Sequence, residues 1–379
     1  MAKNLRGGFT TGACLAAGAR AGAAFWQGRR LAVVPVVALD GTLLDIPVHS
    51  IEQAGSNKVQ VEIIKDAGDD PDITNGTSIF VTFEPGGGEK LSPEELKRTV
   101  FIDNICLVAG EGIGTVTKPG LSVAVGEPAI NPGPRKLLQQ ELEKELGQSS
   151  CIVRIDIPAG AELAHKTLNP ILGVEGGISV IGTTGVLRPM SEEAFKDSLV
   201  PQIDVAMAAG YKTLVYCPGK IGERIASSWG LPEEAMVQTS NFIGHMLEAG
   251  ADRGLESILL FGHIGKLAKV AAGVFHTHNR VGDGRLEVLA AYSGALGMPA
   301  AGIKRILEAN TTEDALPVIS EYHLEKVYDV IAARASCRAE RFLFGKVKVG
   351  TVLVTLKGEL LGMDDRAREI GGDFNWNIK

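Results

Sequence analysis

The sequence has 379 residues, 45% of them hydrophobic and 22% charged, and a formal net charge of −7. This length exceeds one ordinary domain core, so about two or three domains are expected. The composition is typical of a soluble globular protein, and the negative charge excludes a global positive field that would recruit nucleic acid.

The chain begins with no apolar run like that of a signal peptide, and no stretch approaches the length that spans a bilayer. The cytoplasm is therefore the expected location. Five cysteines lie far apart without a C-x-x-C spacing, which argues against a local metal motif and predicts no resident metal. The odd count also argues against a disulfide framework, so the cysteines are interpreted as small buried residues.

The first predicted element is an alanine- and glycine-rich helix over 13–27. Thr10 or Thr11 can cap it, which would leave backbone N–H groups free for an anion. The helix carries small side chains on nearly every face, so we expect another element to pack very close to it.

A β-rich region follows over 31–83, with a hairpin turn at Asp40-Gly41. Its loop over 65–76 holds four aspartates within seven residues, among them Asp66 and Asp69. The spacing does not match an EF-hand. A solvated loop that caps its own backbone and a loop that belongs to a site both remain open.

Three alternating glycines follow a predicted strand over 105–109, and Thr115, Thr117 and Lys118 lie just beyond them. Such glycines can let backbone amides point at a ligand. A helix is predicted over 134–145. Arg135 in its first turn suits a carboxylate ligand, or is an ordinary surface residue.

We predict a domain boundary near 147–150, because strands and helices alternate after it. The expected domains are 1–148, an α+β domain with glycine-rich loops, and 149–345, an α/β domain with a parallel sheet. A strand and tail over 346–379 complete the chain, and a return of this strand to the first domain is one interpretation.

The stretch 177–197 reads as a strand over 178–181, a glycine loop and a helix with Ser191 as the candidate N-cap. The loop is Gly182, Thr183, Thr184 and Gly185. At the carboxyl end of a parallel strand, such a loop is where open α/β sheets bind ligands. The pattern is neither G-x-G-x-x-G nor a P-loop, and a purely steric role for the glycines remains open.

Other predicted strands also end in polar loops, which include Lys220, Ser240 and Lys266. His276 and His278 are two residues apart, with His263 upstream and Arg280 and Asp283 downstream. The sequence offers no third ligand at a spacing known for metal sites. Binding of an anionic substrate, or proton transfer near neutral pH, fits these side chains better.

Several motifs along the chain carry a family resemblance. They are Phe9-Thr10-Thr11-Gly12, the run 65–72, Gly110-Glu111-Gly112-Ile113-Gly114, the run 126–132, Gly182-Thr183-Thr184-Gly185 with the run 188–191, and the runs 262–269 and 275–280. These motifs resemble the CbiD family of cobalt-precorrin-5B C(1)-methyltransferases of anaerobic cobalamin biosynthesis. They occur in the family's order, from the first residues to about residue 319.

This resemblance implies methyl transfer from S-adenosylmethionine to C(1) of a cobalt-containing tetrapyrrole, with the cobalt bound in the substrate. It also implies an α/β and α+β protein of two domains, an α+β sandwich and a Rossmann-like parallel α/β domain. Methyl transfer depends on alignment more than on a protein nucleophile, and a macrocycle with several carboxylates requires cationic groups.

On this basis we assign candidate roles to residues. The catalytic candidates are His263, His276 and His278. The cofactor-binding candidates are Gly182, Thr183, Thr184, Gly185, Asp66 and Asp69, and the substrate-binding candidates are Thr10, Thr11, Lys118, Arg135, Lys220, Lys266 and Arg280.

Two other functions are compatible with the same residues. A carrier that binds tetrapyrrole intermediates without turnover is the main alternative. An enzyme that binds phosphate or nucleotide is the second, although no P-loop or dinucleotide motif supports it. Homo-oligomerisation is left open.

Overall fold

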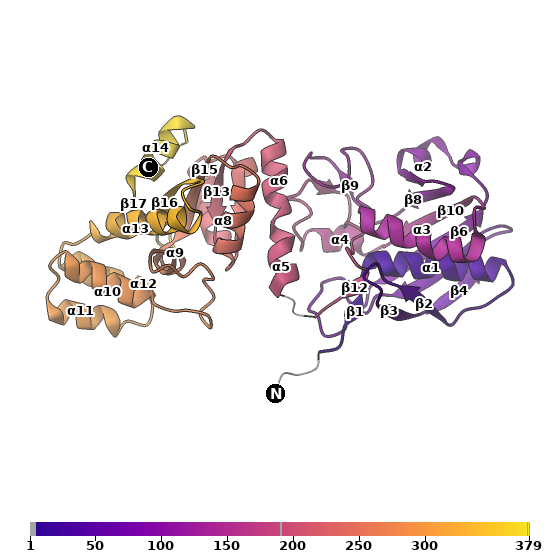
Figure 1. Ribbon diagram of the computed structural model, residues 1–379, viewed down its shortest axis with the longest axis horizontal. Helices are drawn as coiled ribbons and strands as arrows, with labels where there is room; N and C mark the ends of the chain where they lie inside the picture. The colour runs from indigo at the N-terminus through magenta and orange to yellow at the C-terminus, as the bar shows by residue number, and fades with distance from the viewer. Residues whose placement is uncertain (1–4, 190–191, 377, 379) are drawn as a thin grey trace. The chain divides into compact units, whose positions relative to one another are not determined.

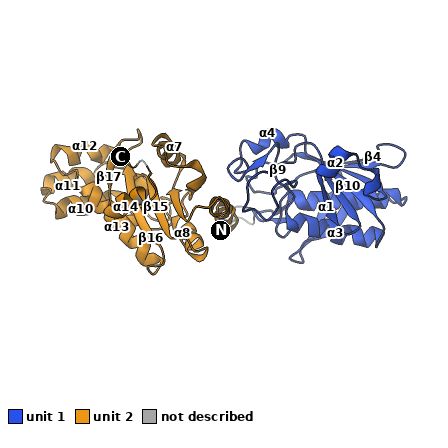
Figure 2. Ribbon diagram, turned by 90° about the horizontal axis from the view of Figure 1, so that it is seen from above, with its two compact units in different colours: residues 1–192 blue, residues 193–379 orange. Residues whose placement is uncertain are grey.

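The computed structural model describes residues 5–189, 192–376 and 378 (Figure 1). The chain divides into two compact units, residues 1–192 (unit 1) and 193–379 (unit 2), coloured separately in Figure 2. Among the described residues, no helix has both the length and the apolar character needed to cross a membrane.

Unit 1 contains a mixed six-stranded sheet in which, among the described residues, β8 and β10 are the only neighbouring strands that pair in parallel. In β5 and β6 buried and less buried residues alternate, as expected for a sheet with one face in a core. The strand order is β4 (Ser50–Gln53), β5 (Val59–Ile64), β6 (Ser78–Pro85), β10 (Cys151–Asp156), β8 (Ile105–Ala109) and β7 (Thr99–Ile102).

Helices α1 (Thr11–Trp26) and α3 (Pro132–Leu146) share one hydrophobic core with this sheet. The predicted close packing of the first helix is confirmed. A Cβ atom on Gly18 would lie 2.6 Å from Val81 Cγ2, and one on Gly22 would lie 2.7 Å from Phe83 Cβ. Small residues therefore let α1 lie directly against β6.

Short elements complete unit 1. The predicted hairpin is confirmed, and its turn is held by a hydrogen bond from Thr42 N to Asp40 Oδ1. The hairpin is β2 (Val33–Val37) with β3 (Leu43–Pro47); β1 (Gly8–Phe9) pairs with β12 (Val186–Leu187), β9 (Thr115–Val116) pairs with β11 (Val174–Glu175), and η1 (Gly88–Lys90), α2 (Pro93–Lys97) and α4 (Gly160–Ala164) lie in connections.

The domain boundary predicted at 148/149 differs from the structure. Strand β10 lies between β6 and β8, so its removal would split the first sheet. The C-terminal segment does not return to unit 1, because β16 pairs with β15 of unit 2. Composition shifts mark a connection, but only strand pairing tells which sheet the next strand joins.

The sequence predicts a strand over 178–181, but this described segment forms no regular strand. Ile178 and Val180 form isolated bridges with Ile113 and Ile130 in unit 1. The glycine loop that follows therefore does not stand at the end of a strand of the parallel sheet. Ser191, the predicted N-cap, lies outside the described residues, and α5 (Glu192–Leu199) follows it.

Unit 2 is built on a five-stranded sheet of which four neighbouring strands are parallel. The predicted alternation of strands and helices is confirmed for this unit. The strand order is β14 (Met236–Gln238), β13 (Thr213–Cys217), β15 (Ser257–His263), β16 (Lys348–Val354) and the antiparallel β17 (Leu360–Met363).

The strands β13, β15 and β16 are buried almost throughout, as expected where helices cover both faces of a parallel sheet. The helices of unit 2 beyond α5 are α6 (Pro201–Ala208), α7 (Lys220–Ser228), η2 (Glu233–Ala235), α8 (Ile243–Asp252), α9 (Ile264–Ala271), α10 (Arg285–Ala295), α11 (Ala300–Leu307), α12 (Thr312–Glu321), α13 (Val327–Phe342) and α14 (Asp365–Asp373).

Asp364 joins two elements of unit 2, and its loss should destabilise the unit. Its Oδ1 accepts hydrogen bonds from Ala367 N at 3.0 Å, as the N-cap of α14, and from Thr351 N of β16 at 2.9 Å. We expect Asp364→Ala to lower the free energy of unfolding by about 3 kcal/mol, from the lost cap and an unsatisfied buried amide. Denaturant unfolding measures this change. The exposed neighbour provides the control, since Asp365→Ala should change it by less than about 0.5 kcal/mol.

Candidate active site

A cavity of about 450 Å³ lies in unit 2 at the carboxyl ends of the parallel strands. His263 ends β15, Leu356 follows β16, and Asn241 follows β14. This edge of a parallel sheet is where open α/β folds bind ligands. The lining residues are Asn241, His263, Gly265, Lys266, Lys269, Thr277, His278, Asn279, Arg285, Thr311, Thr312, Glu313 and Leu356.

Two lysines of α9 form one wall of the cavity. Lys266 Nζ donates hydrogen bonds to Pro218 O at 2.6 Å and to Ser240 O at 3.3 Å. Lys269, whose side chain is only 1% exposed, donates to Thr277 O at 3.1 Å and to Asn279 Oδ1 at 2.6 Å. The lysines therefore hold the loops after β13, β14 and α9 in place.

The charge of these lysines is poorly compensated inside the cavity. Burial lowers the pKa of Lys266, and the neighbouring Lys269 lowers it further. Burial also lowers the pKa of Lys269, although Asp283 Oδ1 at 3.9 Å opposes this. Of the Lys, Arg, Asp and Glu side chains that line the cavity, three are cationic and only Glu313 is acidic.

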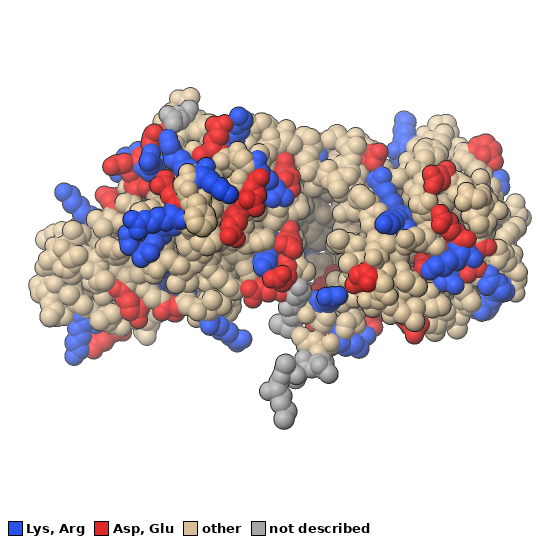
Figure 3. All heavy atoms as spheres, in the orientation of Figure 1, with Lys and Arg blue, Asp and Glu red and all other residues tan. Residues whose placement is uncertain are grey.

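This local excess of positive charge contrasts with the rest of the molecule. The chain as a whole is acidic, and the face drawn in Figure 3 shows lysine and arginine mixed with aspartate and glutamate on both units. The cavity is thus a specific feature of the fold and not part of a general basic surface.

His263 is held through both of its ring nitrogens. Nδ1 accepts a hydrogen bond from Gly265 N at 3.1 Å and thereby caps α9. The ring hydrogen therefore lies on Nε2, which contacts Glu313 Oε1 at 2.8 Å. The same carboxylate oxygen accepts a hydrogen bond from Leu356 N at 2.9 Å. These contacts fix the ring as part of the cavity wall and argue against the proton-transfer role considered from the sequence.

The other two histidines are placed differently. His278 lines the cavity and is exposed, and its Nδ1 accepts a hydrogen bond from Arg280 N at 3.1 Å. The ring of His276 packs against Phe242, with ring centroids 5.0 Å apart, and is not part of the cavity lining. Arg280 and Lys220 are exposed, and Lys220 begins α7 after the turn that holds Lys266. Of the candidates in unit 2, His263, Lys266 and His278 share the cavity.

The candidates at the start of α1 lie in unit 1, where the structure contradicts the expected free helix terminus. Thr10 is the N-cap and accepts a hydrogen bond from Ala13 N at 3.3 Å, while Gly12 N donates to Ile181 O at 3.0 Å. Thr11 Oγ1 bonds both the N–H and the carbonyl of Ile181. These amides and hydroxyls are thus engaged within the protein.

The loop 182–185 packs on the same helix terminus. A Cβ atom on Gly182 would lie 2.2 Å from Thr10 Oγ1, and one on Gly133 would lie 2.4 Å from Gly182 O. Gly185 O accepts from Thr10 N at 3.0 Å, and Thr184 O accepts from Leu39 N at 2.7 Å. For the glycines, the steric role that the sequence left open is the one these contacts support. Thr183, the remaining cofactor-binding candidate of this loop, lies between Gly182 and Thr184.

The aspartates proposed for the cofactor are bound to the N-terminal segment. The guanidinium of Arg6 pairs with the Asp66 carboxylate and, together with a hydrogen bond from Gly68 N, lowers its pKa. Asp69 Oδ2 accepts a hydrogen bond from Arg6 N at 2.7 Å. The negative charge of Asp66 is therefore already neutralised by a cation of the same chain.

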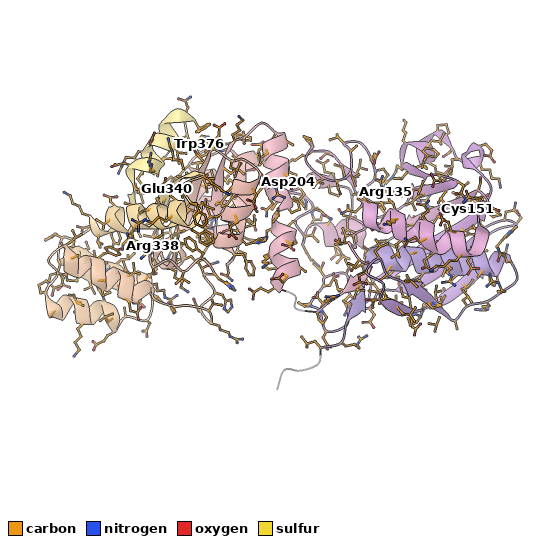
Figure 4. All side chains as sticks on the ribbon, in the orientation of Figure 1. Arg135, Cys151, Asp204, Arg338, Glu340 and Trp376 are labelled. Atoms are coloured by element: carbon orange, nitrogen blue, oxygen red, sulfur yellow. The ribbon has the colours of Figure 1, made fainter. Side chains whose placement is uncertain are left out.

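Lys118 and Arg135 also bond to their own surroundings. Lys118 Nζ lies 3.4 Å from Ile171 O. Arg135, labelled in Figure 4, lies in the first turn of α3. It donates to Ile130 O at 2.7 Å and to Glu127 Oε2 at 3.0 Å, so it fixes the preceding loop. Neither cation belongs to the cavity of unit 2.

Sequence reasoning missed several residues of the cavity, mainly Lys269, Thr277, Arg285 and Glu313. One signal could have identified Lys269: the run 264–271 is otherwise apolar or glycine, and only Lys266 and Lys269 interrupt it. A second lysine in an apolar helix indicates a specific buried partner. Within the described part of the chain, no three His, Cys, Asp or Glu side chains form a metal-binding group.

Comparison with known proteins shows the family of the chain. Residues 1–189 match the family model described as CbiD, and residues 276–365 match that described as CbiD, C-terminal domain. A protein of Moorella thermoacetica is 45% identical over 100% of both chains. The chain belongs to the CbiD family. The first family model ends near the end of unit 1, which supports the division seen in the structure.

Two relatives in the CbiD family carry the same name. The Moorella protein is called Cobalt-precorrin-5B C(1)-methyltransferase, and so is a protein of Methanocaldococcus jannaschii that is 43% identical over 95% of this chain and 96% of its own length. A solved structure of the cobalamin biosynthesis protein cbiD from Archaeoglobus fulgidus matches 73% of this chain and 83% of its own, with 24% identity and a TM-score of 0.38.

Proposed function

We propose that this CbiD-family protein transfers a methyl group from S-adenosylmethionine to C(1) of cobalt-precorrin-5B in cobalamin biosynthesis. The observation that carries the proposal is identity of 45% and 43% with relatives of that name, over 100% and 95% of the chain. Because the identity extends over both units, it covers the cavity together with the rest of the protein.

The methyl donor follows from the chemistry of the reaction. An electron pair of the ring carbon attacks the methyl carbon, the carbon–sulfur bond breaks, and S-adenosylhomocysteine leaves with a neutral sulfur. The protein has to align the two reactants, which contributes to the rate through proximity and orientation. The sulfonium is positive, so Lys266 and Lys269 would repel it, and we place the anionic substrate at the cavity of unit 2.

The arrangement of unit 2 is compatible with this use. We infer that unit 2 is a Rossmann-like domain, since the sequence order reverses between β13 and β15 of its sheet, and ligands of doubly wound sheets bind at such a reversal. For unit 1 we infer an α+β sandwich, with α1 and α3 on its sheet. The cytoplasmic location and any homo-oligomer stay predictions.

Mass spectrometry with a labelled donor tests the reaction. The protein is incubated with cobalt-precorrin-5B and S-adenosylmethionine that carries a deuterated methyl group, under exclusion of oxygen. We expect the macrocycle to gain the labelled methyl group and S-adenosylhomocysteine to be released in equal amount. NMR of the product then locates the methyl group at C(1).

Two other results would point to the alternative functions. Substrate that binds but stays unlabelled, while an active relative labels it, would indicate a carrier protein. Thermal stabilisation by a nucleotide but not by S-adenosylhomocysteine would indicate a nucleotide-binding enzyme. Either result would overturn the proposed methyl transfer.

A further inference from the structure

Each of the two lysines in the cavity wall uses only two of its N–H donors in hydrogen bonds to the described residues. An ammonium group has three N–H donors. Lys266 uses two of them on Pro218 O and Ser240 O, and Lys269 uses two on Thr277 O and Asn279 Oδ1. Among the described residues, no hydrogen-bond partner takes the third hydrogen of either lysine. Each lysine can therefore donate one more bond to a ligand in the cavity.

Thr277 provides an independent sign of a missing partner. The residue is 2% exposed and lines the cavity, yet within the described ranges its Oγ1 has no hydrogen-bond partner. A buried hydroxyl without a partner costs about 1–3 kcal/mol, so a native structure that keeps one calls for an explanation. Its carbonyl oxygen accepts a hydrogen bond from Lys269 Nζ, so the residue that carries this hydroxyl is in direct contact with that ammonium.

The charge of this site selects the kind of ligand. Lys266, Lys269 and Arg285 line it, and Asp283 Oδ1 lies 3.4 Å from Arg285 Nε and 3.9 Å from Lys269 Nζ. Two carboxylates, Asp283 and Glu313, do not balance these three cations, so an anion is favoured over a neutral group. Paired ammonium and hydroxyl donors suit the oxygens of a carboxylate.

We propose that this cavity binds one acetate or propionate arm of the macrocyclic substrate through its carboxylate, with Lys266, Lys269 and Thr277 as the donors. The proposal rests on the proposed function, because it takes the anion to be part of the tetrapyrrole. The cavity volume of about 450 Å³ is at the lower end of the usual range of about 300–1,000 Å³ for small-molecule sites, which suits one arm better than a whole macrocycle.

The substitution Thr277→Val tests this site with little structural change, since Oγ1 has no hydrogen bond to another described residue that could be lost. We expect the dissociation constant of cobalt-precorrin-5B, measured by anaerobic absorbance titration, to rise at least about tenfold, as for one hydrogen bond to a charged group. The thermal midpoint should stay close to that of the wild type.

Thr213 offers a matched control. It is 1% exposed, its Oγ1 likewise lacks a partner within the described ranges, and it lies at the start of β13, away from the carboxyl edge. Thr213→Val should leave the dissociation constant unchanged. An equal loss of affinity in both variants would show that Thr277 acts only through packing, which would overturn the proposal.

A second variant addresses the charge. Lys269→Met removes the ammonium, and we expect about a hundredfold weaker binding if the variant folds; if it does not fold, the Thr277→Val comparison decides. Wild-type affinity in folded Thr277→Val and Lys269→Met would overturn the carboxylate site while the methyl transfer stands. A wild-type protein that neither binds nor methylates cobalt-precorrin-5B would instead overturn the proposed function and this site with it.

Discussion

Replacement of Gly112 by alanine is expected to unfold unit 1 at ordinary temperature, with a loss of more than about 4 kcal/mol. Gly112 has φ of +72°, and a Cβ atom there would lie 1.8 Å from the backbone oxygen of Ile157. The left-handed backbone alone costs about 1–2 kcal/mol for a residue with a side chain. The clash is with backbone on the neighbouring turn, so it cannot be relieved by a rotamer change.

Two further glycines show how tightly this region is packed. A Cβ atom on Gly160 would lie 2.1 Å from Gly112 O, and one on Gly177 would lie 2.2 Å from the same oxygen. Gly112 O also accepts a hydrogen bond from Ile178 N at 2.9 Å. Three backbone segments therefore meet at Gly112, and a shift of any one of them breaks contacts of the others.

Gly126 provides the control for the free-energy cost of a positive φ alone. Its φ is +89°, but nothing lies within 4 Å of a Cβ atom built on it. We expect Gly126→Ala to cost only about 1–2 kcal/mol. Circular dichroism and denaturant unfolding compare the two variants. If Gly112→Ala lowered the free energy of unfolding no more than Gly126→Ala does, this result would contradict the close approach of the three segments.

Gly112 also shows why the glycine run over 110–114 of unit 1 was misinterpreted from the sequence. Alternating glycines over 110–114 are compatible with amides that point at a ligand. In the structure Gly110 N donates to Ile155 O and Gly114 N donates to Ile178 O. Partners so distant in sequence leave no local trace, because a glycine needed for ligand approach and one needed for backbone approach look alike.

Features with a local cause were predicted well. Strand β8 has the predicted bounds, since a short apolar run between turn residues defines it. The helix α9 was missed because its eight residues follow directly on β15 without a break. Lys266 was therefore assigned to a loop and Lys269 was not considered, so the presence of both lysines at one cavity could not be inferred.

Glu313, which also lines the cavity, was missed from the sequence for a different local reason. Glu313 is fifty residues from its partner His263 and belongs to the first turn of α12, where an acidic residue is expected for the helix alone. The sequence around Glu313 therefore accounts for an acidic residue at this position without any functional site. Only the fold shows that its Oε1 also bonds Leu356 N after β16.

We expect Glu313→Leu to lower kcat/KM for cobalt-precorrin-5B by about a hundredfold. The leucine cannot accept from His263 Nε2 or Leu356 N, so the ring and the loop after β16 lose their common anchor. Lys266 and the N-terminus of α9 lie beside this ring in the cavity. Displacement of binding groups by about 1 Å can cost two orders of magnitude in rate.

The conservative variant separates positioning from charge. The amide oxygen of Glu313→Gln can accept the same two hydrogen bonds, so we expect kcat/KM within about threefold of the wild type. Glu321→Leu, at the exposed end of the same helix, serves as the control for a lost carboxylate and should keep full activity. Equal losses in the Gln and Leu variants would show that the negative charge itself is required, and the positioning role would be wrong. Separate kcat and KM values extend the test, because a displaced binding wall should raise KM more than it lowers kcat.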